Sequence, residues 1–369
     1  MERLYPNLIL DALRNVRYPA SGKNIVEAGM VADDIRIDGN KVSFSLIFDR
    51  PTDPFIKSLV RAAEAAISTY ISPEVDIKGN IAVTTRQAMP APAEKPLKGV
   101  KNIIGVSSGK GGVGKSTVAA NLAVALAREG YKVGLLDADI FGPSMPKMFG
   151  IEDQELYMHK VDDRDLIIPA ERYGVKLLSI GFLVDKNAPV LWRGSMASNA
   201  LKQLIADADW GELDYFVIDM PPGTSDIHLT LVQTLPITGV VIVSTPQQVA
   251  LADARKGIAM FTGDKVNVPI LGMVENMAWF TPEQHPDEKY YIFGREGAVK
   301  LADELGVKLL AQIPLVASVC DSGDGGEPIA NRDSVMGHEF MHLAHEVTEA
   351  VAQRNASLPP TQKVELKKQ

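Results

Sequence analysis

Short apolar runs and amphipathic stretches alternate along most of the chain after residue 100. The apolar runs are nearly continuous and rich in valine and isoleucine, which is typical of strands buried on both faces of a parallel sheet. The stretches between them have the 3.6-residue spacing of helices. The predicted strands cover 102–106, 132–136, 175–180, 215–218, 239–243, 270–274 and 308–313, and the predicted helices 116–128, 195–206, 226–234, 248–261, 297–305 and 337–353. This alternation predicts an α/β fold with a seven- or eight-stranded, mainly parallel sheet covered by helices on both faces.

The first 85 residues have a different pattern. Positions 42, 44, 46 and 48 are apolar and alternate with other residues, which predicts a half-buried strand over 41–48. Helical spacing covers 8–16 and 53–70, and short apolar runs at 75–77 and 80–83 predict two more strands. We therefore expect a small α+β domain over residues 1–85, large enough to fold alone.

A segment rich in proline and alanine separates the two patterns. Residues 89–96, Met-Pro-Ala-Pro-Ala-Glu-Lys-Pro, have no periodic apolar face, which is typical of a semi-rigid linker. The tail after residue 353 carries Pro359, Pro360 and several lysines, and we expect it to be flexible. The predicted organisation is a small domain at 1–85, a linker at 86–99, an α/β domain at 100–353 and a tail at 354–369.

Composition narrows the class of protein. Hydrophobic residues make up 46% and charged residues 23%, an ordinary globular balance. The formal net charge of −8 argues against a general nucleic-acid binder. Cys320 is the one cysteine, so no intrachain disulfide can form. No signal-peptide core begins the chain, and no apolar run approaches the ~18 residues that cross a bilayer. We expect a cytoplasmic protein with no nucleic-acid or membrane partner.

A glycine-rich loop joins the strand predicted at 102–106 to the helix predicted at 116–128. It matches the P-loop pattern G-x-x-x-x-G-K-[ST] with the residues Gly109, Lys110, Gly111, Gly112, Val113, Gly114, Lys115, Ser116 and Thr117. Glycines let backbone N–H groups surround a phosphate, and the helix N-terminus adds donors and positive potential. Lys115 can neutralise the β- and γ-phosphate oxygens, and the Ser116 hydroxyl can bind Mg²⁺. The loop predicts a site for a magnesium nucleotide.

Carboxylates follow two later strands at the edge where open α/β sheets bind their ligands. Asp137 and Asp139 follow the strand at 132–136, and Asp219 follows the strand at 215–218. We expect Asp139 to orient a water for attack on the γ-phosphate, Asp137 to support the Mg²⁺ shell, and Asp219 to serve as the metal-site aspartate. The N–H of Gly223 can contact the γ-phosphate, which predicts a switch that senses hydrolysis.

The base of the nucleotide is indicated less directly. The chain lacks Asn-Lys-x-Asp, the usual guanine-reading sequence, and this favours adenine. Asn276, just after the strand at 270–274, is one candidate for adenine contact, although an asparagine there equally suits a turn. The backbone around Pro314, after the last strand, is a second candidate.

The loop and the segments around these residues resemble a known family. The form GKGGVGKST, with Lys110 after the first glycine, is similar to the deviant P-loop of the ParA, MinD and nitrogenase-iron-protein ATPases. Together with LLDADIFGPSMPKMFG, LWRGSMAS, LDYFVIDMPPGTSDIHLTL, STPQQVALADARKG and GMVENM, it resembles the Mrp family over residues 99–353. These ATPases are described as iron–sulfur cluster carriers or scaffolds. Residues 24–31 resemble a small domain that recurs in iron–sulfur assembly factors, although Tyr18-Pro19 stands where that family usually has Asp-Pro.

The resemblance implies a function and partners. It implies slow ATP hydrolysis in a homodimer, in which Lys110 reaches the partner's nucleotide, and work in iron–sulfur cluster assembly or in delivery to apo-proteins. Typical members of the family carry Cys-x-x-Cys soon after the Glu-Asn-Met segment, and one pair from each subunit would hold a bridging [4Fe–4S] cluster. Residues 279–294 contain no cysteine here. A dimer offers two Cys320 thiols, which would need His285 or an outside ligand to complete a site.

Three interpretations of the function therefore stay open. The first is an ATPase of cluster assembly or delivery. The second is a nucleotide-switched interaction ATPase of the ParA/MinD kind with no cluster of its own. The third is a binding module in which the nucleotide serves only to hold a conformation. The aromatic residues Trp279, Phe280, Tyr290 and Tyr291 suit a docking loop in either of the first two cases, or cover for the sheet edge.

Two further patterns give weaker evidence of function. His338-Glu339-Phe340-Met341-His342 matches the zinc-protease pattern H-E-x-x-H. Zinc binding would need a third ligand and a cleft, and downstream carboxylates such as Glu365 lie in the tail expected to be flexible, so we interpret the segment as a solvated helix face. Arg193 is a candidate for phosphate or partner contact, or for an exposed salt bridge.

Overall fold

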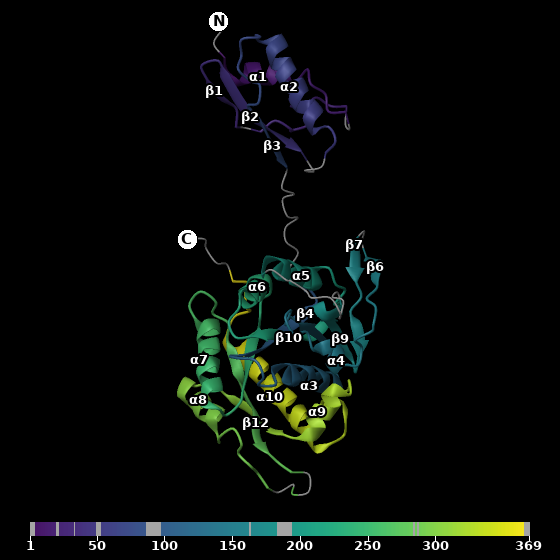
Figure 1. Cartoon of the computed structure of the whole chain (residues 1–369), viewed down its shortest axis with the longest axis vertical. Coiled ribbons are helices and arrows are strands. Elements are labelled where there is room, and N and C mark those ends of the chain that lie inside the picture. The colour runs from purple at the N-terminus through teal and green to yellow at the C-terminus, as the bar shows by residue number, and fades with distance from the viewer. Residues whose placement is uncertain are drawn as a thin grey trace. The chain divides into compact units, whose positions relative to one another are not determined.

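The computed structural model describes residues 4–19, 22–32, 34–48, 53–85, 97–161, 164–182, 194–282, 285 and 288–364. The chain divides into two compact units, Met1–Glu94 and Lys95–Gln369, which are coloured purple to blue and blue to yellow in Figure 1. Residues 86–96 of the predicted linker, and Arg193, lie outside the described residues.

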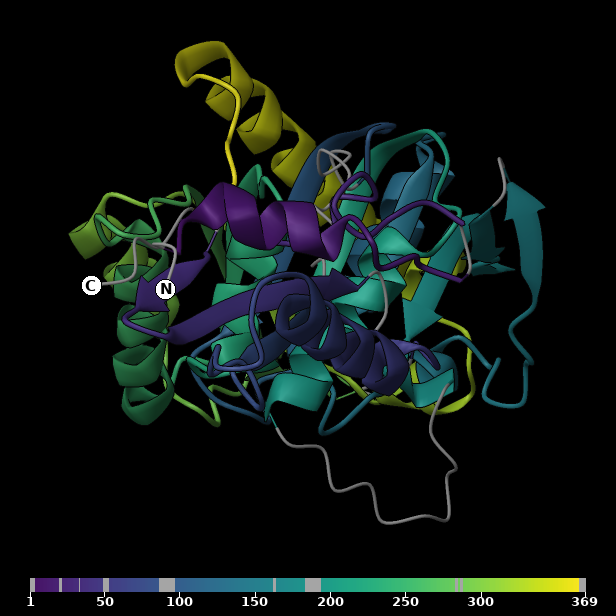
Figure 2. The ribbon, with the colours of Figure 1, turned by 90° about the horizontal axis from the view of Figure 1, so that it is seen from above.

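The N-terminal unit is a small α+β structure. Its sheet has the order β1-β2-β3, with β1 (Arg36–Asp38) antiparallel to β2 (Lys41–Phe48) and β3 (Ile81–Thr85) parallel to β2. Helices α1 (Pro6–Leu13) and α2 (Ile56–Tyr70) contact each other and are the purple and dark-blue helices of Figure 2. The strand predicted at 75–77 is wrong, because Asp76 forms only an isolated bridge with Lys41. Val75 and Ile77 are buried in the core, so apolar alternation arises there without a strand.

The C-terminal unit is built on one eight-stranded sheet. Its order is β13-β12-β11-β4-β10-β5-β9-β8, parallel throughout except for β8, which pairs antiparallel with β9. The strands are β4 (Val100–Ser108), β5 (Val133–Asp137), β8 (Ala170–Arg172), β9 (Val175–Ser179), β10 (Leu213–Pro222), β11 (Gly239–Ser244), β12 (Ile270–Phe280) and β13 (Leu309–Leu315). The predicted, mainly parallel sheet is confirmed.

Helices cover both faces of this sheet, as the sequence predicts. One face carries α3 (Lys115–Arg128), α4 (Met145–Met148), α9 (Ala317–Asp324) and α10 (Val335–Ser357), and the other α5 (Gly194–Ala206), α6 (Asp226–Thr234), α7 (Gln248–Thr262) and α8 (Gly297–Leu305). Short 3₁₀ turns lie at Ile180–Phe182 and Ile329–Asn331. Helix α3 lies between the sheet and α10, so ten of its fourteen residues are buried. Burial on all sides fixes the position of the helix that follows the P-loop.

Several features differ from the predicted elements, and α4, β8 and α9 were not predicted at all. The hairpin of β6 (Met158–Val161) and β7 (Arg164–Ile167) was not predicted, because its side chains are mostly exposed and carry no apolar pattern. Helix α10 continues to Ser357, into the segment expected to be a flexible tail, and the Val364 N–H donates to the Val232 carbonyl at 3.0 Å. Strand β12 runs on to Phe280, which bridges Tyr290. No helix in the described part of the chain is long and apolar enough to span a bilayer.

Candidate nucleotide-binding site

The glycine-rich loop lies at the carboxyl end of β4, between its neighbours β10 and β11, and leads into α3. Gly112 and Gly114 have φ of 80° and 81°, a conformation that favours glycine. A Cβ on Gly114 would lie 2.1 Å from Asn276 Nδ2, and one on Gly109 would lie 2.1 Å from the Asp253 carbonyl carbon of α7. Gly114 is therefore required by space and by conformation, and Gly109 by space.

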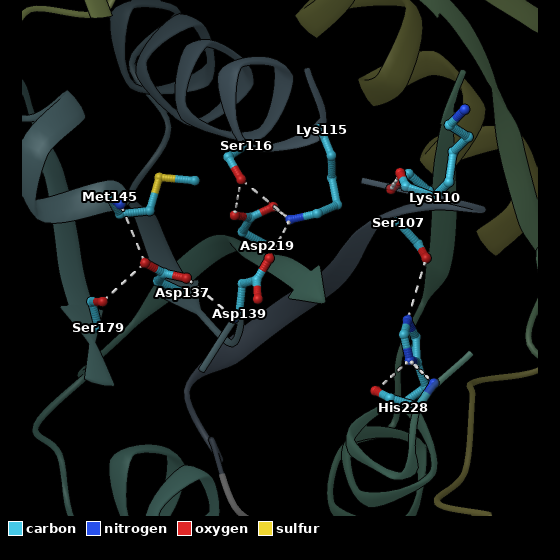
Figure 3. Close-up of polar contacts among 12 residues, drawn as sticks. Ser107, Lys110, Lys115, Ser116, Asp137, Asp139, Met145, Ser179, Asp219 and His228 are labelled. Carbon is cyan, nitrogen blue, oxygen red and sulfur yellow. Dashed lines mark hydrogen bonds and ion pairs between the residues drawn. The ribbon is translucent and has the colours of Figure 1, made fainter. Parts of the chain in front are cut away.

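Lys115 and Ser116, the first residues of α3, converge on Asp219 of β10 (Figure 3). Lys115 Nζ lies 2.5 Å from Asp219 Oδ1, and Ser116 Oγ donates to Asp219 Oδ2 at 2.6 Å. The Lys115 and Asp219 side chains are 6% and 0% exposed. Burial raises the pKa of Asp219, and the neighbouring Lys115 opposes that rise. The predicted phosphate lysine, magnesium hydroxyl and metal-site aspartate thus form one contiguous cluster.

Asp139 and Asp137 complete this cluster from the β5 side. Asp139 Oδ2 lies 3.7 Å from Lys115 Nζ, and burial raises the Asp139 pKa against the opposing effect of Lys115. Asp137 is fully buried and accepts bonds from Ser179 Oγ at 2.9 Å and from the Met145 and Asp139 N–H groups, both at 3.2 Å. Sequence reasoning missed Ser179. Ser179 is the last residue of β9, so its position at a strand end was the signal that places it at the same sheet edge as the aspartates.

Burial, and secondarily the nearby Asp219, raises the pKa of Asp137 from 3.8 to about 7. Above pH 4 the unfolded chain has released this proton, whereas the folded protein keeps it until about pH 7. The unfolding free energy that this proton contributes is therefore lost as the pH rises from about 4 to about 7. We expect the metal-free, nucleotide-free protein to lose about 2 kcal/mol of unfolding free energy between pH 5.5 and 8, relative to Asp137→Asn.

Urea unfolding at the two pH values measures this difference. Ser179→Ala is the matched variant, because it removes one hydrogen bond to Asp137 and leaves the carboxyl in place. It should keep the pH dependence that Asp137→Asn removes. Equal pH dependence in the wild-type and Asp137→Asn proteins would show that this carboxyl is already ionised at pH 5.5.

Gly223 and Asn276, which the sequence predicts to contact the nucleotide, make hydrogen bonds within the chain in this structure. The Gly223 N–H donates to the Ser108 carbonyl at 2.9 Å, and Ser108 Oγ donates to the Lys110 carbonyl at 2.9 Å. Asn276 Nδ2 donates to the Val113 carbonyl at 2.8 Å, so this amide ties β12 to the P-loop. Pro314 is partly buried in β13. Adenine contact by Asn276 or Pro314 stays a prediction.

Lys110 and Cys320 lie apart from this cluster. The Lys110 side chain points away from the carboxylates in Figure 3. Cys320 is exposed on α9, with Sγ 3.8 Å from Asp324 Oδ2. His285 lies 3.5 Å from Glu288. Among the residues that the structure describes, no group of three histidine, cysteine or acidic residues is arranged to hold a metal ion.

The two histidines of the H-E-x-x-H segment lie on the outer face of α10, whereas Phe340 between them is buried. Its histidines each pair with a carboxylate: His338 with Asp333 at 2.9 Å and His342 with Glu346 at 4.0 Å. Both imidazoles are more than 60% exposed. This geometry agrees with a solvated helix face.

The fold and the loop together define the class of the protein. A P-loop at the carboxyl edge of a mainly parallel sheet, with helices on both faces, is the arrangement of a P-loop NTPase. Residues 99–348 match the model of the ParA-type family described as NUBPL iron-transfer P-loop NTPase, and the chain belongs to this family. Residues 7–77 match the family of iron–sulfur cluster assembly proteins. The predicted resemblance is confirmed.

Individual relatives agree with this assignment. The chain is 43% identical to the iron–sulfur cluster carrier protein of Synechocystis sp. over 327 residues, which span 88% of this chain and 91% of that protein. It is 47% identical to the mouse (Mus musculus) iron–sulfur cluster transfer protein NUBPL over 262 residues, 69% of this chain and 79% of the relative.

Solved structures agree as well. The nucleotide-binding protein of Archaeoglobus fulgidus, solved in complex with ADP, is 37% identical and superposes with a TM-score of 0.57, covering 67% of this chain and 94% of that one. The septum site-determining protein MinD of Pyrococcus horikoshii, 23% identical with a TM-score of 0.50 over 69% of this chain and 98% of that one, shares the fold.

Proposed function

We propose that this chain binds Mg–ATP in its P-loop, hydrolyses it, and uses the cycle in iron–sulfur cluster assembly or delivery to apo-proteins. The observation that carries the proposal is the convergence of Lys115, Ser116, Asp139 and Asp219 at the N-terminus of α3. The ADP complex of the Archaeoglobus fulgidus relative and the names of the carrier and transfer relatives support it.

Nucleotide binding requires Lys115 to exchange partners. Its ammonium is held by Asp219 and lies near Asp139, so phosphate oxygens of ATP must take over part of this ion pairing. The free N–H groups of the loop and the start of α3 bind the β-phosphate. Ser116, Asp219 and Asp137 supply the oxygen donors that Mg²⁺ prefers, and the bound ion neutralises charge on the phosphates.

Hydrolysis then depends on positioning and charge neutralisation. A water oxygen attacks the γ-phosphorus, the bond from that phosphorus to the β–γ bridging oxygen breaks, and ADP and phosphate leave. Asp139 orients the water, and its raised pKa suits it to accept a proton. The Lys110 side chain points away from the carboxylates of its own chain, which fits a role in the partner's site of a homodimer.

The iron–sulfur cluster would be cargo, and this chain supplies few ligands for it. A [4Fe–4S] cluster held by thiolates takes four cysteines, whereas two copies of this chain offer two. Any cluster must therefore draw further ligands from other side chains, a small thiol or the recipient protein. The cysteine-free segment at 279–294 favours the second candidate, a nucleotide-switched interaction ATPase that holds no cluster itself.

Anaerobic reconstitution with iron and sulfide, followed by incubation with an apo-ferredoxin, separates the two candidates. We expect cluster absorption to appear in the acceptor faster with the protein and Mg–ATP than without them. Cys320→Ser tests whether the lone thiol takes part, and should slow transfer if it does. ATP turnover without bound iron and without any effect on the acceptor would remove the carrier role and leave the interaction switch.

A further inference from the structure

His228 is a buried histidine that the proposed chemistry does not use. It lies in the first turn of α6, is 1% exposed, and packs edge-to-face on Phe261 of α7 with ring centroids 5.9 Å apart. Its Nδ1 lies 3.1 Å from the backbone nitrogen of Ser225, and its Nε2 lies 3.5 Å from Ser107 Oγ of β4 (Figure 3). The side chain therefore spans from the start of α6 to the strand that leads into the P-loop.

The hydrogen bonds fix the protonation of this imidazole. The Ser225 N–H can only donate, so Nδ1 must be the acceptor and the proton must sit on Nε2, 3.5 Å from Ser107 Oγ. Ser225 Oγ also lies 3.2 Å from Nδ1, and the backbone of Pro221 contacts the ring as well. Burial lowers the pKa of His228 to about 4, in agreement with a neutral ring at neutral pH. A neutral side chain with one acceptor and one donor thus bridges Ser225 and Ser107.

This bridge adds to the pairing of β10 with β4, which runs as far as Pro222 opposite Ser108. The Gly223 N–H donates directly to the Ser108 carbonyl at 2.9 Å, and Ser225 is tied to Ser107 through His228. Only Thr224 lies between the two attached residues. If Gly223 donates to a γ-phosphate, it must release Ser108, whereas the attachment through His228 need not break.

We propose that His228 is a positioning residue of the ATPase, which anchors Ser225 to β4 so that Gly223 and Thr224 move alone when a γ-phosphate binds. This inference rests on the proposed ATPase function. Without the anchor, the start of α6 would shift together with Gly223, and the N–H would no longer be held in reach of the phosphate. His228 is thereby assigned a part in distinguishing ATP from ADP, because ADP has no γ-phosphate for Gly223 to contact.

Three substitutions test the anchor. His228→Gln keeps an amide oxygen to accept from Ser225 and an N–H to donate to Ser107, so it should behave like the wild type. His228→Leu removes the contacts of both ring nitrogens, those of Nδ1 with Ser225 N and Oγ included, and Ser107→Ala removes only the acceptor at the far end with little change in volume. For the last two, we expect ADP affinity to stay within about twofold. Affinity for a non-hydrolysable ATP analogue and kcat should fall about tenfold, the effect of one lost hydrogen bond.

The measurements are calorimetric titrations of the full chain with Mg–ADP and with the magnesium analogue, phosphate release, and thermal melting. A melting temperature of Ser107→Ala close to that of the wild type shows that the fold is retained. Equal loss of ADP and analogue binding in His228→Leu and Ser107→Ala, or no loss of either, overturns the inference while leaving the ATPase in place. Absence of nucleotide binding by the wild type overturns the proposed function and this inference with it.

Discussion

Replacement of Asp139 by asparagine should reduce kcat for ATP hydrolysis by about a hundredfold or more, while Mg–ATP affinity changes less than about threefold. Asp139 is the carboxylate beside Lys115 that is not hydrogen-bonded to Ser116, and an amide cannot accept the proton of an attacking water. Its pKa is raised by burial, which makes the carboxylate more basic than an exposed aspartate. Phosphate release under saturating ATP measures kcat, and titration calorimetry measures affinity.

Asp209→Asn is the matched control for this prediction. Asp209 is a partly exposed aspartate of the same unit that pairs with His159 at 3.0 Å, away from the P-loop cluster. Its replacement should leave both kcat and affinity unchanged. Wild-type turnover by Asp139→Asn would exclude this carboxylate from the chemistry and leave the water to be oriented by another group.

Lys115→Ala should weaken Mg–ATP binding by more than about a hundredfold, because Lys115 is the one cation that the described part of the chain buries in the proposed phosphate site. It should also destabilise the nucleotide-free protein by about 3 kcal/mol at pH 8, since Asp219 would be left buried without its ion-pair partner. The pKa of Asp219 is already raised by burial, and losing Lys115 raises it further. The destabilisation should therefore shrink as the pH falls and Asp219 takes up a proton.

Lys110→Ala provides the comparison within the same loop. Lys110 points away from the carboxylates, so its loss should change the unfolding free energy by less than about 0.5 kcal/mol and leave ATP binding by one chain nearly intact. In a homodimer it should lower kcat, because the partner's site would lose a positive charge. Urea unfolding at pH 5 and pH 8 and calorimetry on both variants make the test. Equal effects of the two substitutions would contradict the separate roles of the two lysines.

Much of the fold could be predicted because buried parallel strands carry a distinctive sequence pattern. The apolar runs at 215–218 and 239–243 lie inside β10 and β11, and the ends of the helices at 226–234 and 297–305 agree with α6 and α8. Exposed elements carry no such pattern, which is why the β6–β7 hairpin was missed. The false strand at 75–77 shows the converse, since core burial alone can mimic a strand.

The candidate site was likewise predictable only in part. Because Asp137, Asp139 and Asp219 follow parallel strands, the sequence predicts that they share the carboxyl edge of the sheet. The structure brings them together around Lys115. The pairing of Lys115 with Asp219 and the tie from Asn276 to the P-loop depend on side-chain directions, which periodicity does not encode. The role of His228 could not be predicted from its place in the sequence, because a histidine at the third position of a helix is no signal of a bridging side chain. Ser225, the N-cap residue of the same helix, is an ordinary capping residue.

Titration calorimetry of the full chain with Mg–ATP tests the central claim most directly. The account predicts saturable binding at one site per chain, competed by ADP and lost in Lys115→Ala. Absence of binding by the wild-type protein, or equal binding by Lys115→Ala, would contradict it.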